Sequence, residues 1–535
     1  MKTTSEPALP APTERAALLA RLAEPRCWDL VVIGGGASGL GVALDAAARG
    51  HRVVLVEARD FAKGTSSRAT KLVHGGVRYL AQGNVSLVHE ALHERTTLLR
   101  NAPHLAQPLA FVMPSYRVWE TPFYGAGLKV YDALAGSAGL GATEFLGRMG
   151  ALRCLPGIRA EGLKGGVKYW DGQFDDARLA LALARTAARE GALLINYCPV
   201  CALEHAAGKV SAVVCEDAET GRRYTLRTRA VVNATGVWVD EVRAMDAAST
   251  GAPHEALVVP SQGVHLVVDR DFLPTDHALL VPKTADGRVL FAVPWLGKVL
   301  IGTTDTERPH AEIEPRALPE EVAFLLRESA RYLRRAPQIE DVRSCWAGLR
   351  PLVRPHHFSS AQTRTVSREH TVLVEPSGLV TVTGGKWTTY RAMAEDVLRK
   401  CEGAALLAPR PAGVTRDLPL VGAPRAPVAH RMCEAPGPHL YGTEARHVQA
   451  LPGAQRWLAP GLSEAMVRFA ARFEYARTVE DVLARRSRML FLDARLARQL
   501  APDVAMLLRA ELGAQHDAQC AAFEALAATY ACPPT

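Results

Sequence analysis

The amino-acid sequence predicts an α/β protein in three parts: a doubly wound parallel sheet, an antiparallel β sheet and a C-terminal α-helical cap. An apolar strand pattern at residues 29–33 runs into a glycine-rich turn and a helix, and a second apolar strand follows at residues 53–56. Short apolar runs separated by turn residues fill residues 255–335, as in an antiparallel sheet. Helical patterns continue from residue 411 to the end, with breaks rich in proline and glycine.

The glycine-rich turn has the G-x-G-x-x-G spacing of a dinucleotide-binding fingerprint. Gly34 permits the tight turn, Gly36 lets the backbone approach a pyrophosphate, and Gly39 lets the helix pack close to the strand. The helix N-terminus offers unpaired N–H groups to the phosphates. Glu57 ends the second strand, where a carboxylate accepts hydrogen bonds from a ribose diol. The pattern therefore predicts a bound dinucleotide, because a glycine-rich turn without a ligand does not explain Glu57.

Composition and charge exclude several classes of protein. The net charge is +8 over 535 residues, of which 48% are hydrophobic and 22% charged, as is ordinary for a soluble enzyme. No apolar run approaches the roughly 18 residues of a transmembrane helix, and the N-terminal residues lack the apolar core of a signal peptide. We therefore expect a cytoplasmic protein. The absence of long basic runs argues against a nucleic-acid partner.

The ten cysteines do not indicate a metal or redox centre. Cys198 and Cys201 form a C-x-x-C, but no second pair and no histidine lies at the spacing of a metal site. The pair follows a strand pattern, where buried thiols are common. We expect no bound metal.

The choice between a nicotinamide and a flavin dinucleotide depends on two later segments. Residues 64–80 are dense in hydroxyls, glycines and cations, and they directly follow the ribose-binding position. Such a loop can pass under a pyrophosphate and reach the ring end of the same cofactor. Residues 384–391 form a second glycine-rich turn that enters a helix. A helix N-terminus directed at the N1/C2=O edge of a flavin stabilises the negative charge of the reduced ring, so these segments favour FAD.

Short motifs spread over the chain carry a resemblance to a known family. They are residues 32–36 (VIGGG), 43–47 (ALDAA), 64–67 (GTSS), 71–80 (KLVHGGVRYL), 233–236 (NATG), 302–305 (GTTD), 348–352 (GLRPL), 384–391 (GGKWTTYR) and 481–488 (DVLARRSR). With these motifs the chain resembles the FAD-dependent, aerobic, quinone-linked glycerol-3-phosphate dehydrogenases nearly end to end. The resemblance implies a glutathione-reductase-like FAD (Rossmann) domain, an antiparallel β substrate domain and the C-terminal α-helical cap.

The predicted domain boundaries follow from the motifs and the strand patterns. We expect an N-terminal tail at residues 1–27, a discontinuous FAD-binding domain at 28–115, 160–250 and 340–402, a substrate-binding domain at 116–159 and 251–339, and an α-helical domain at 405–535. The cofactor-binding residues that we predict are Gly34, Gly36, Gly39, Glu57, Ser66, Ser67, Lys71, His74, Gly236, Gly385, Lys386, Thr388 and Thr389.

Oxidation of sn-glycerol 3-phosphate requires a clamp for the phosphate dianion, which arginine provides because its planar guanidinium binds phosphate bidentately and stays charged. The resemblance implies substrate contacts from Arg78, Tyr79, Arg350, Arg368 and Lys386. Arginines are abundant in this chain, so each could instead be a solvated surface residue. Lys386 lies in a glycine-rich turn and could instead act on the flavin alone.

The catalytic residues that we predict are His265, Arg350 and His74. Because imidazole titrates near neutral pH, either histidine could accept the proton of the C2 hydroxyl, and we favour His265. Either histidine could also only hydrogen-bond the flavin or the backbone. Arg350 would stabilise the developing alkoxide. In this hypothesis hydride moves from C2 to N5 of FAD, and dihydroxyacetone phosphate is the product.

The resemblance implies that a membrane quinone reoxidises the flavin, with the protein attached peripherally to the cytoplasmic face of the inner membrane. Residues 121–149 are apolar and glycine-rich, with Lys129, Arg148 and Arg153 as candidate membrane anchors. An ordinary helix pair of the cap explains this segment equally well. Whether the chain forms a homodimer stays open.

Three alternative functions are also consistent with the sequence. One is a glycerol-3-phosphate oxidase that uses oxygen, although the insertion expected of that subfamily is not evident. A flavin amine or amino-acid oxidase shares the architecture, but its carboxylate substrate needs fewer cations than a phosphorylated alcohol. A flavin-binding scaffold or an FAD-dependent RNA modifier does not explain the intact motif at residues 74–80.

Overall fold

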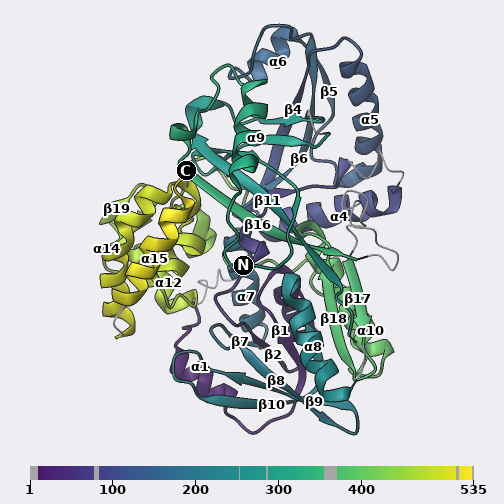
Figure 1. Cartoon of the computed structure of the whole chain (residues 1–535), viewed down its shortest axis with the longest axis vertical. Helices are drawn as coiled ribbons and strands as arrows, with labels where there is room; N and C mark the ends of the chain where they lie inside the picture. The colour runs from purple at the N-terminus through teal and green to yellow at the C-terminus, as the bar shows by residue number, and fades with distance from the viewer. Residues whose placement is uncertain are drawn as a thin grey trace, which may run out of the picture.

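The computed structural model describes residues 10–77, 84–251, 254–284, 287–354, 370–513 and 517–532. Two large sheets form its framework (Figure 1). In the view of Figure 1 the sheet that contains β1 lies below the sheet that contains β11, and the C-terminal helices, in yellow, lie at one flank. The predicted α/β fold class with a C-terminal helical part is confirmed.

The lower sheet contains the glycine-rich turn. Its strands follow the order β17 (His370–Val374), β18 (Leu379–Gly384), β10 (Arg223–Asn233), β1 (Trp28–Ile33), β2 (Val53–Val56) and β7 (Leu193–Ile195). The five strands from β18 to β7 are parallel, and β17 is an antiparallel edge strand. β8 (Val200–Ala206) and β9 (Lys209–Glu216) extend β10 as an antiparallel meander.

Helices cover both faces of the lower sheet, which explains why β1 and β2 are continuous apolar runs rather than alternating ones. One face of the sheet packs against α2 (Ala37–Ala48), α7 (Asp176–Arg189) and α10 (Tyr390–Gly403). The other face packs against α1 (Arg15–Leu22), α8 (Val239–Thr250) and the meander. This arrangement is the doubly wound sheet that the sequence predicts.

The upper sheet is mostly antiparallel. Its strands follow the order β15 (Thr306–Glu307), β11 (Val258–Asp269), β14 (Lys298–Gly302), β13 (Leu290–Trp295), β12 (Ala278–Val281), β4 (Ala106–Ser115), β6 (Gly165–Phe174) and β3 (Leu72–Val73), with β16 (Ser344–Val353) on β11 and β5 (Glu144–Gly147) on β6. Only β12 and β4 run parallel among these pairs. α9 (Pro319–Ala330) packs beside β11 and β14.

The sheet membership differs from the predicted domain boundaries. β3, β4, β6 and β16 belong to the upper sheet, although the sequence assigned residues 28–115, 160–250 and 340–402 to the FAD-binding domain. The alternation of a strand shows that one of its faces is buried, but not which neighbour it pairs with, because tertiary contacts decide the pairing. Segments of the predicted FAD-binding domain therefore join segments of the predicted substrate-binding domain in the upper sheet.

The C-terminal helices form a separate layer. They are α11 (Ala445–Gln449), α12 (Glu464–Phe473), α13 (Met489–Leu492), α14 (Ala494–Leu512) and α15 (Asp517–Tyr530), and residues 404–437 before them are largely turns and irregular backbone. Local signals set their ends. The side chain of Asp493 accepts a hydrogen bond from the backbone N–H of Leu496 at the start of α14, and Gly513 ends that helix with φ +71°.

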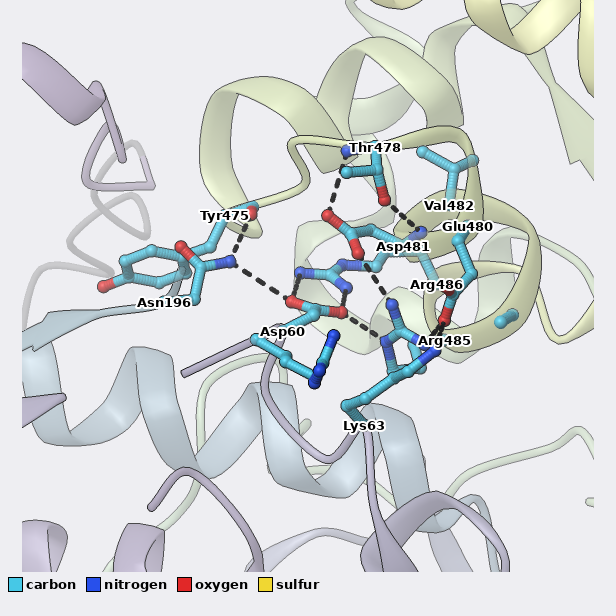
Figure 2. A network of polar contacts seen from close by, with 12 residues as sticks. Asp60, Lys63, Asn196, Tyr475, Thr478, Glu480, Asp481, Val482, Arg485 and Arg486 are labelled. Atoms are coloured by element: carbon cyan, nitrogen blue, oxygen red, sulfur yellow. Dashed lines mark hydrogen bonds and ion pairs between the residues drawn. The ribbon is translucent and has the colours of Figure 1, made fainter. Parts of the chain in front are cut away.

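A buried ionic cluster joins the C-terminal helices to the loop that follows β2 (Figure 2). The carboxylate of Asp60, which is fully buried, accepts hydrogen bonds from Arg485, Arg486 and Asn196. Burial alone would raise the pKa of Asp60, but the charges of the two arginines hold it below its usual value. Glu480 pairs with Lys63 of the same loop and with Arg485. We refer to these residues as the Asp60 cluster.

A surface rich in exposed apolar side chains lies at the far end of the upper sheet, around α5 (Glu120–Ala135), β5 and α6 (Arg148–Cys154) (Figure 1). Its members are Val118 (77% exposed), Trp119 (51%), Phe123 (65%), Val130 (51%), Phe145 (53%) and Met149 (62%). We call it the α5 surface. Within the described residues, the helices are all too short or too polar to span a membrane.

Candidate active site

A cavity of about 1410 Å³ lies between the two sheets. From the lower sheet it is lined by the residues that follow the carboxyl ends of β1, β2, β10 and β18, which is where ligands bind in open parallel sheets. From the upper sheet it is lined by residues of β11 and β16 and by apolar side chains of β4, β13 and α5. The cavity therefore has two ends built from different parts of the chain.

The three glycines of the first turn have different roles at the dinucleotide end. Gly34 has φ +107°, and a Cβ at this position would lie 2.7 Å from the carbonyl oxygen of Ala234. A Cβ at Gly39 would lie 1.9 Å from the carbonyl oxygen of Gly34, so only glycine allows α2 to pack this close to β1. Gly36 faces the cavity and would meet only the hydroxyl of Ser66, at 3.0 Å. Its backbone is thus open to a bound pyrophosphate.

Glu57 is held in place by backbone amides. Its Oε2 accepts a hydrogen bond from the N–H of Gly35 at 2.6 Å, and its Oε1 accepts one from the N–H of Arg59 at 2.8 Å. Burial raises the pKa of Glu57, and these two hydrogen bonds oppose the rise. The side chain lines the cavity, so its remaining acceptor positions suit a ribose diol.

Three segments meet in the middle of the cavity. The hydroxyl of Ser66 accepts a hydrogen bond from the N–H of Ala37 at 2.9 Å, at the first turn of α2. The indole N–H of Trp387 donates to the carbonyl oxygen of Ser66 at 2.9 Å. Thr388 Oγ1 accepts from the backbone N–H of His74 at 3.2 Å. These bonds place the N-terminus of α10 beside the loop that leads from the dinucleotide turn.

His265 lies at the other end of the cavity, in the middle of β11. It pairs with Gly302 of β14 and with Trp346 of β16. A Cβ at Gly302 would lie 2.3 Å from Cδ2 of His265, so the glycine provides the space for the imidazole. Nε2 of His265 lies 3.0 Å from the hydroxyl of Thr70. Burial holds the pKa of His265 well below its usual value, and the charges of Arg350 and Lys71 lower it further. The imidazole is therefore neutral and able to accept a proton.

Arg350 reaches the same end of the cavity from β16. Its guanidinium donates to the carbonyl oxygen of Thr304 at 3.1 Å and to the hydroxyl of Thr303 at 3.1 Å, and it lies 3.4 Å from the carboxylate of Asp305. A Cβ at Gly263 would lie 2.4 Å from Nη2 of Arg350, so β11 needs a glycine at this position for the guanidinium to fit. These contacts fix a positive charge near His265.

The cavity brings most of the predicted site residues together. Those that line it are Gly34, Gly36, Glu57, Ser66, His74, Gly236, His265, Arg350, Gly385, Lys386 and Thr388. Four predicted cofactor contacts lie beneath the cavity wall instead, namely Gly39, Ser67, Lys71 and Thr389. A sequence motif does not distinguish the residues that contact a ligand from those that support the ligand-binding loop.

Lys71 is the clearest of these differences. Its ammonium is fully buried and donates to the carboxylate of Asp176 and to the carbonyl oxygen of Ser67, both at 2.7 Å. Burial lowers its pKa to about 7, against the opposing effect of Asp176.

The predicted substrate contacts Arg78, Tyr79 and Arg368 lie outside the described residues.

The observed cavity fits an extended dinucleotide. At one end a helix N-terminus, a bare glycine backbone and a fixed carboxylate provide sites for pyrophosphate and ribose. At the other end a second helix N-terminus and a cluster of cations suit a ring that becomes negatively charged on reduction. Among the residues that the structure describes, no group of three or more histidine, cysteine or acidic side chains could hold a metal ion.

Comparisons with known proteins agree with this geometry. Residues 29–395 match the model of the FAD dependent oxidoreductase family, and residues 413–519 match the C-terminal domain of alpha-glycerophosphate oxidase. The mitochondrial glycerol-3-phosphate dehydrogenase of Macaca fascicularis is 40% identical, over 95% of this chain and 74% of that protein. The solved glycerol-3-phosphate dehydrogenase of Bacillus halodurans, complexed with FAD, is 30% identical with a TM-score of 0.77, over 97% of this chain and 98% of that one.

The chain belongs to the FAD-dependent glycerol-3-phosphate dehydrogenase family. FAD is its cofactor, as the motifs predict. An L-alpha-glycerophosphate oxidase of Mycoplasma pneumoniae, with FAD bound, shares the fold at a TM-score of 0.56 and 15% identity, over 73% of this chain and 98% of that one.

Sequence reasoning missed several residues around His265 in this family member. Thr70, Thr303 and Trp346 contact His265 or Arg350, but none was predicted as a site residue. The family motif at residues 302–305 was a signal for Thr303. No local signal marks Trp346, because its role depends on the pairing of β16 with β11.

Proposed function

We propose that this chain oxidises sn-glycerol 3-phosphate to dihydroxyacetone phosphate and passes the electrons to a membrane quinone. The observation that carries the proposal is the meeting of a neutral, buried imidazole and a fixed guanidinium at the cavity end remote from the dinucleotide turn. An alcohol oxidation needs a proton acceptor at the hydroxyl and a cation for the oxygen that loses the proton. The names of the relatives support the choice of alcohol.

In this proposal the residues of the chain bind and orient the substrate. Arg350 and Lys386 attract the phosphate dianion, and Arg350 also stabilises the alkoxide that develops at C2. His265 accepts the proton of the C2 hydroxyl, and Thr70 fixes its imidazole ring. His74, held to Thr388 through its backbone, is the second candidate for that proton. FAD, when bound, supplies the acceptor for the hydride that leaves C2.

The α5 surface supports the membrane part of the proposal. Its exposed aromatic and aliphatic side chains are the kind that enter the boundary between headgroups and acyl chains, and Lys129, Arg148 and Arg153 lie on the same elements. Phe123 and Val130 of this surface also line the cavity, so the cavity reaches this surface. We propose peripheral attachment to the cytoplasmic face of the inner membrane through this surface, from which a quinone could reach the flavin.

Anaerobic mixing of the purified flavoprotein with sn-glycerol 3-phosphate tests the reaction. We expect the flavin absorbance to bleach within one turnover and dihydroxyacetone phosphate to form in equal amount. Bleaching by an amino acid, but not by glycerol 3-phosphate, would reject the assignment.

Steady-state turnover with a soluble quinone, compared with turnover in oxygen alone, tests the electron acceptor. We expect reduction of the quinone with little hydrogen peroxide. Rapid oxygen consumption with stoichiometric peroxide would instead assign an oxidase, which the match of residues 413–519 to an oxidase domain makes the relevant alternative.

Sedimentation with vesicles that contain anionic lipids tests the membrane surface. Replacing Trp119 and Phe123 by serine should weaken binding more than tenfold, because each buried aromatic side chain contributes about 1.5–3 kcal/mol. The matched control replaces Val414 and Trp457, which are exposed elsewhere. Equal loss in both variants would argue against the α5 surface.

A further inference from the structure

Lys71 is a buried cation that the proposed reaction does not use. It does not line the cavity, and its side chain is fully buried. Its backbone has a positive φ of +65°. Burial of an ammonium is costly unless the charge is paired and hydrogen-bonded. The Lys71 ammonium is paired with Asp176 and hydrogen-bonded to Ser67, and it also contacts a tryptophan that stacks on His265.

Residues of the C-terminal helical layer hold Lys71 in place. Arg488, directly before α13, donates to the carbonyl oxygen of Ser67 at 2.8 Å and to the carboxylate of Asp176 at 3.0 Å. Lys71 donates to the same two acceptors. Phe491 of α13 lies with its ring centre 5.3 Å from the Lys71 ammonium. The position of Lys71 is therefore set by residues more than 400 positions further along the chain.

Trp346 links Lys71 to His265. The Lys71 ammonium lies 4.8 Å from the centre of the Trp346 ring, within the range of a cation–π contact. The imidazole of His265 stacks on the same indole, with ring centres 4.3 Å apart and an angle of 23° between the planes. All three side chains are buried, so water does not screen the charge between them. The indole thus contacts both the cation and the proton acceptor.

We propose that Lys71 is a positioning residue that acts through Trp346: it holds the indole against the imidazole of His265 and presents a positive charge to the far side of this stack. The proposal rests on the proposed function, in which His265 accepts the substrate proton. Lys71 itself touches neither substrate nor the reacting atoms.

The charges around both groups determine the expected pH dependence. Asp175 and Asp176 at the start of α7 and Arg488 face Lys71, whereas Arg350 and Lys71 are the charges that act on His265. With a pKa of about 7, Lys71 gains a proton as the pH falls through neutrality, before an ordinary imidazole would. Its new charge then opposes protonation of His265. His265 is consequently harder to protonate as the pH falls.

The test compares kcat/KM for glycerol 3-phosphate against pH, between about pH 5 and pH 8, in holoenzymes of matched flavin content. In Lys71→Met the acidic limb of the profile should move up by about one pH unit, so that activity at the acid end falls about tenfold more than at the alkaline end. Lys71→Arg keeps the charge and should restore the wild-type profile. Lys298→Met is the control, because Lys298 pairs with Asp269 outside the cavity.

A second variant protects the test against misfolding of Lys71→Met. Trp346→Leu removes the stack and leaves the pairing of Lys71 with Asp176 untouched, and it should shift the same limb in the same direction. An equal loss of activity at every pH in both variants would overturn the proposal and leave Lys71 a structural residue. Absence of glycerol 3-phosphate turnover in the wild type would instead reject the proposed function.

Discussion

The two ends of the cavity are stabilised by different means. The dinucleotide end depends on backbone contacts between near neighbours in the chain, such as Gly39 against Gly34. The reacting end and the loop that leads to it depend on buried charges from remote segments, such as Arg486 with Asp60, and Lys71 and Arg488 with Asp176. Close packing needs only glycines at the correct spacing, whereas buried charges need partners that arrive from another layer of the fold.

Substitution of Gly39 by alanine should have the largest effect on the protein, because it disrupts the backbone packing at the dinucleotide end of the cavity. The new Cβ would lie 1.9 Å from the carbonyl oxygen of Gly34, so α2 must move away from β1. We expect a protein without FAD, or an insoluble one, as measured by the ratio of flavin to protein absorbance. Gly403→Ala is the matched control, since nothing lies within 4 Å of its Cβ position near the end of α10. Full flavin content in Gly39→Ala would contradict this account of the turn.

Removal of Arg486 tests the charge-dependent region. Arg486→Met leaves the buried carboxylate of Asp60 with one arginine instead of two (Figure 2). Breaking a buried pair by removal of one partner costs about 3–5 kcal/mol, so we expect a clear fall in the melting temperature of the holoenzyme. Arg223→Met, which removes an exposed ion pair with Glu216, should change it little. Equal melting temperatures for both variants would show that the Asp60 cluster contributes no stability.

Arg350→Met separates chemistry from stability at the reacting end. The guanidinium is partly exposed to the cavity and donates to Thr303 and Thr304, so its loss should leave flavin content and melting temperature nearly unchanged. Loss of one donor to a developing oxyanion lowers kcat about 100- to 1000-fold. Single-turnover flavin bleaching measures this rate directly. A rate within a few-fold of wild type would remove Arg350 from the mechanism.

Substitution of Glu480 should have the smallest of these effects, and its effect on the free energy of unfolding should depend on pH. Burial alone would raise its pKa, but Arg485 and Lys63 lower it to about 2, below its usual value of 4.5. A carboxyl with a lowered pKa stabilises the folded state above its unfolded pKa, and this contribution disappears as the pH falls from about 4.5 to 2. Glu480→Gln should therefore lose about 2–3 kcal/mol at neutral pH, and the difference from wild type should shrink below about pH 4.5. A difference that does not vary with pH would contradict this.

The local sequence patterns predicted the dinucleotide end well. The spacing of Gly34, Gly36 and Gly39 and the carboxylate of Glu57 all occupy one βαβ unit, so their relative positions follow from short-range geometry. The reacting end was predicted only in part. The chemistry of imidazole predicts His265 and the resemblance predicts Arg350, and the structure places both at the cavity. Their distance from each other depends on the pairing of β11 with β16.

The α/β class, the FAD fingerprint and the helical C-terminal layer could be predicted from the amino-acid sequence, because each is encoded by periodicity or spacing within a few tens of residues. Three features depend on tertiary contacts: which strands enter the upper sheet, the position of Lys71 outside the cavity lining, and the hydrogen bonds of Arg485, Arg486 and Arg488 to the segment of residues 60–71. Buried charges can be stable only beside their partners. Those partners come from opposite ends of the chain, so no local pattern records them.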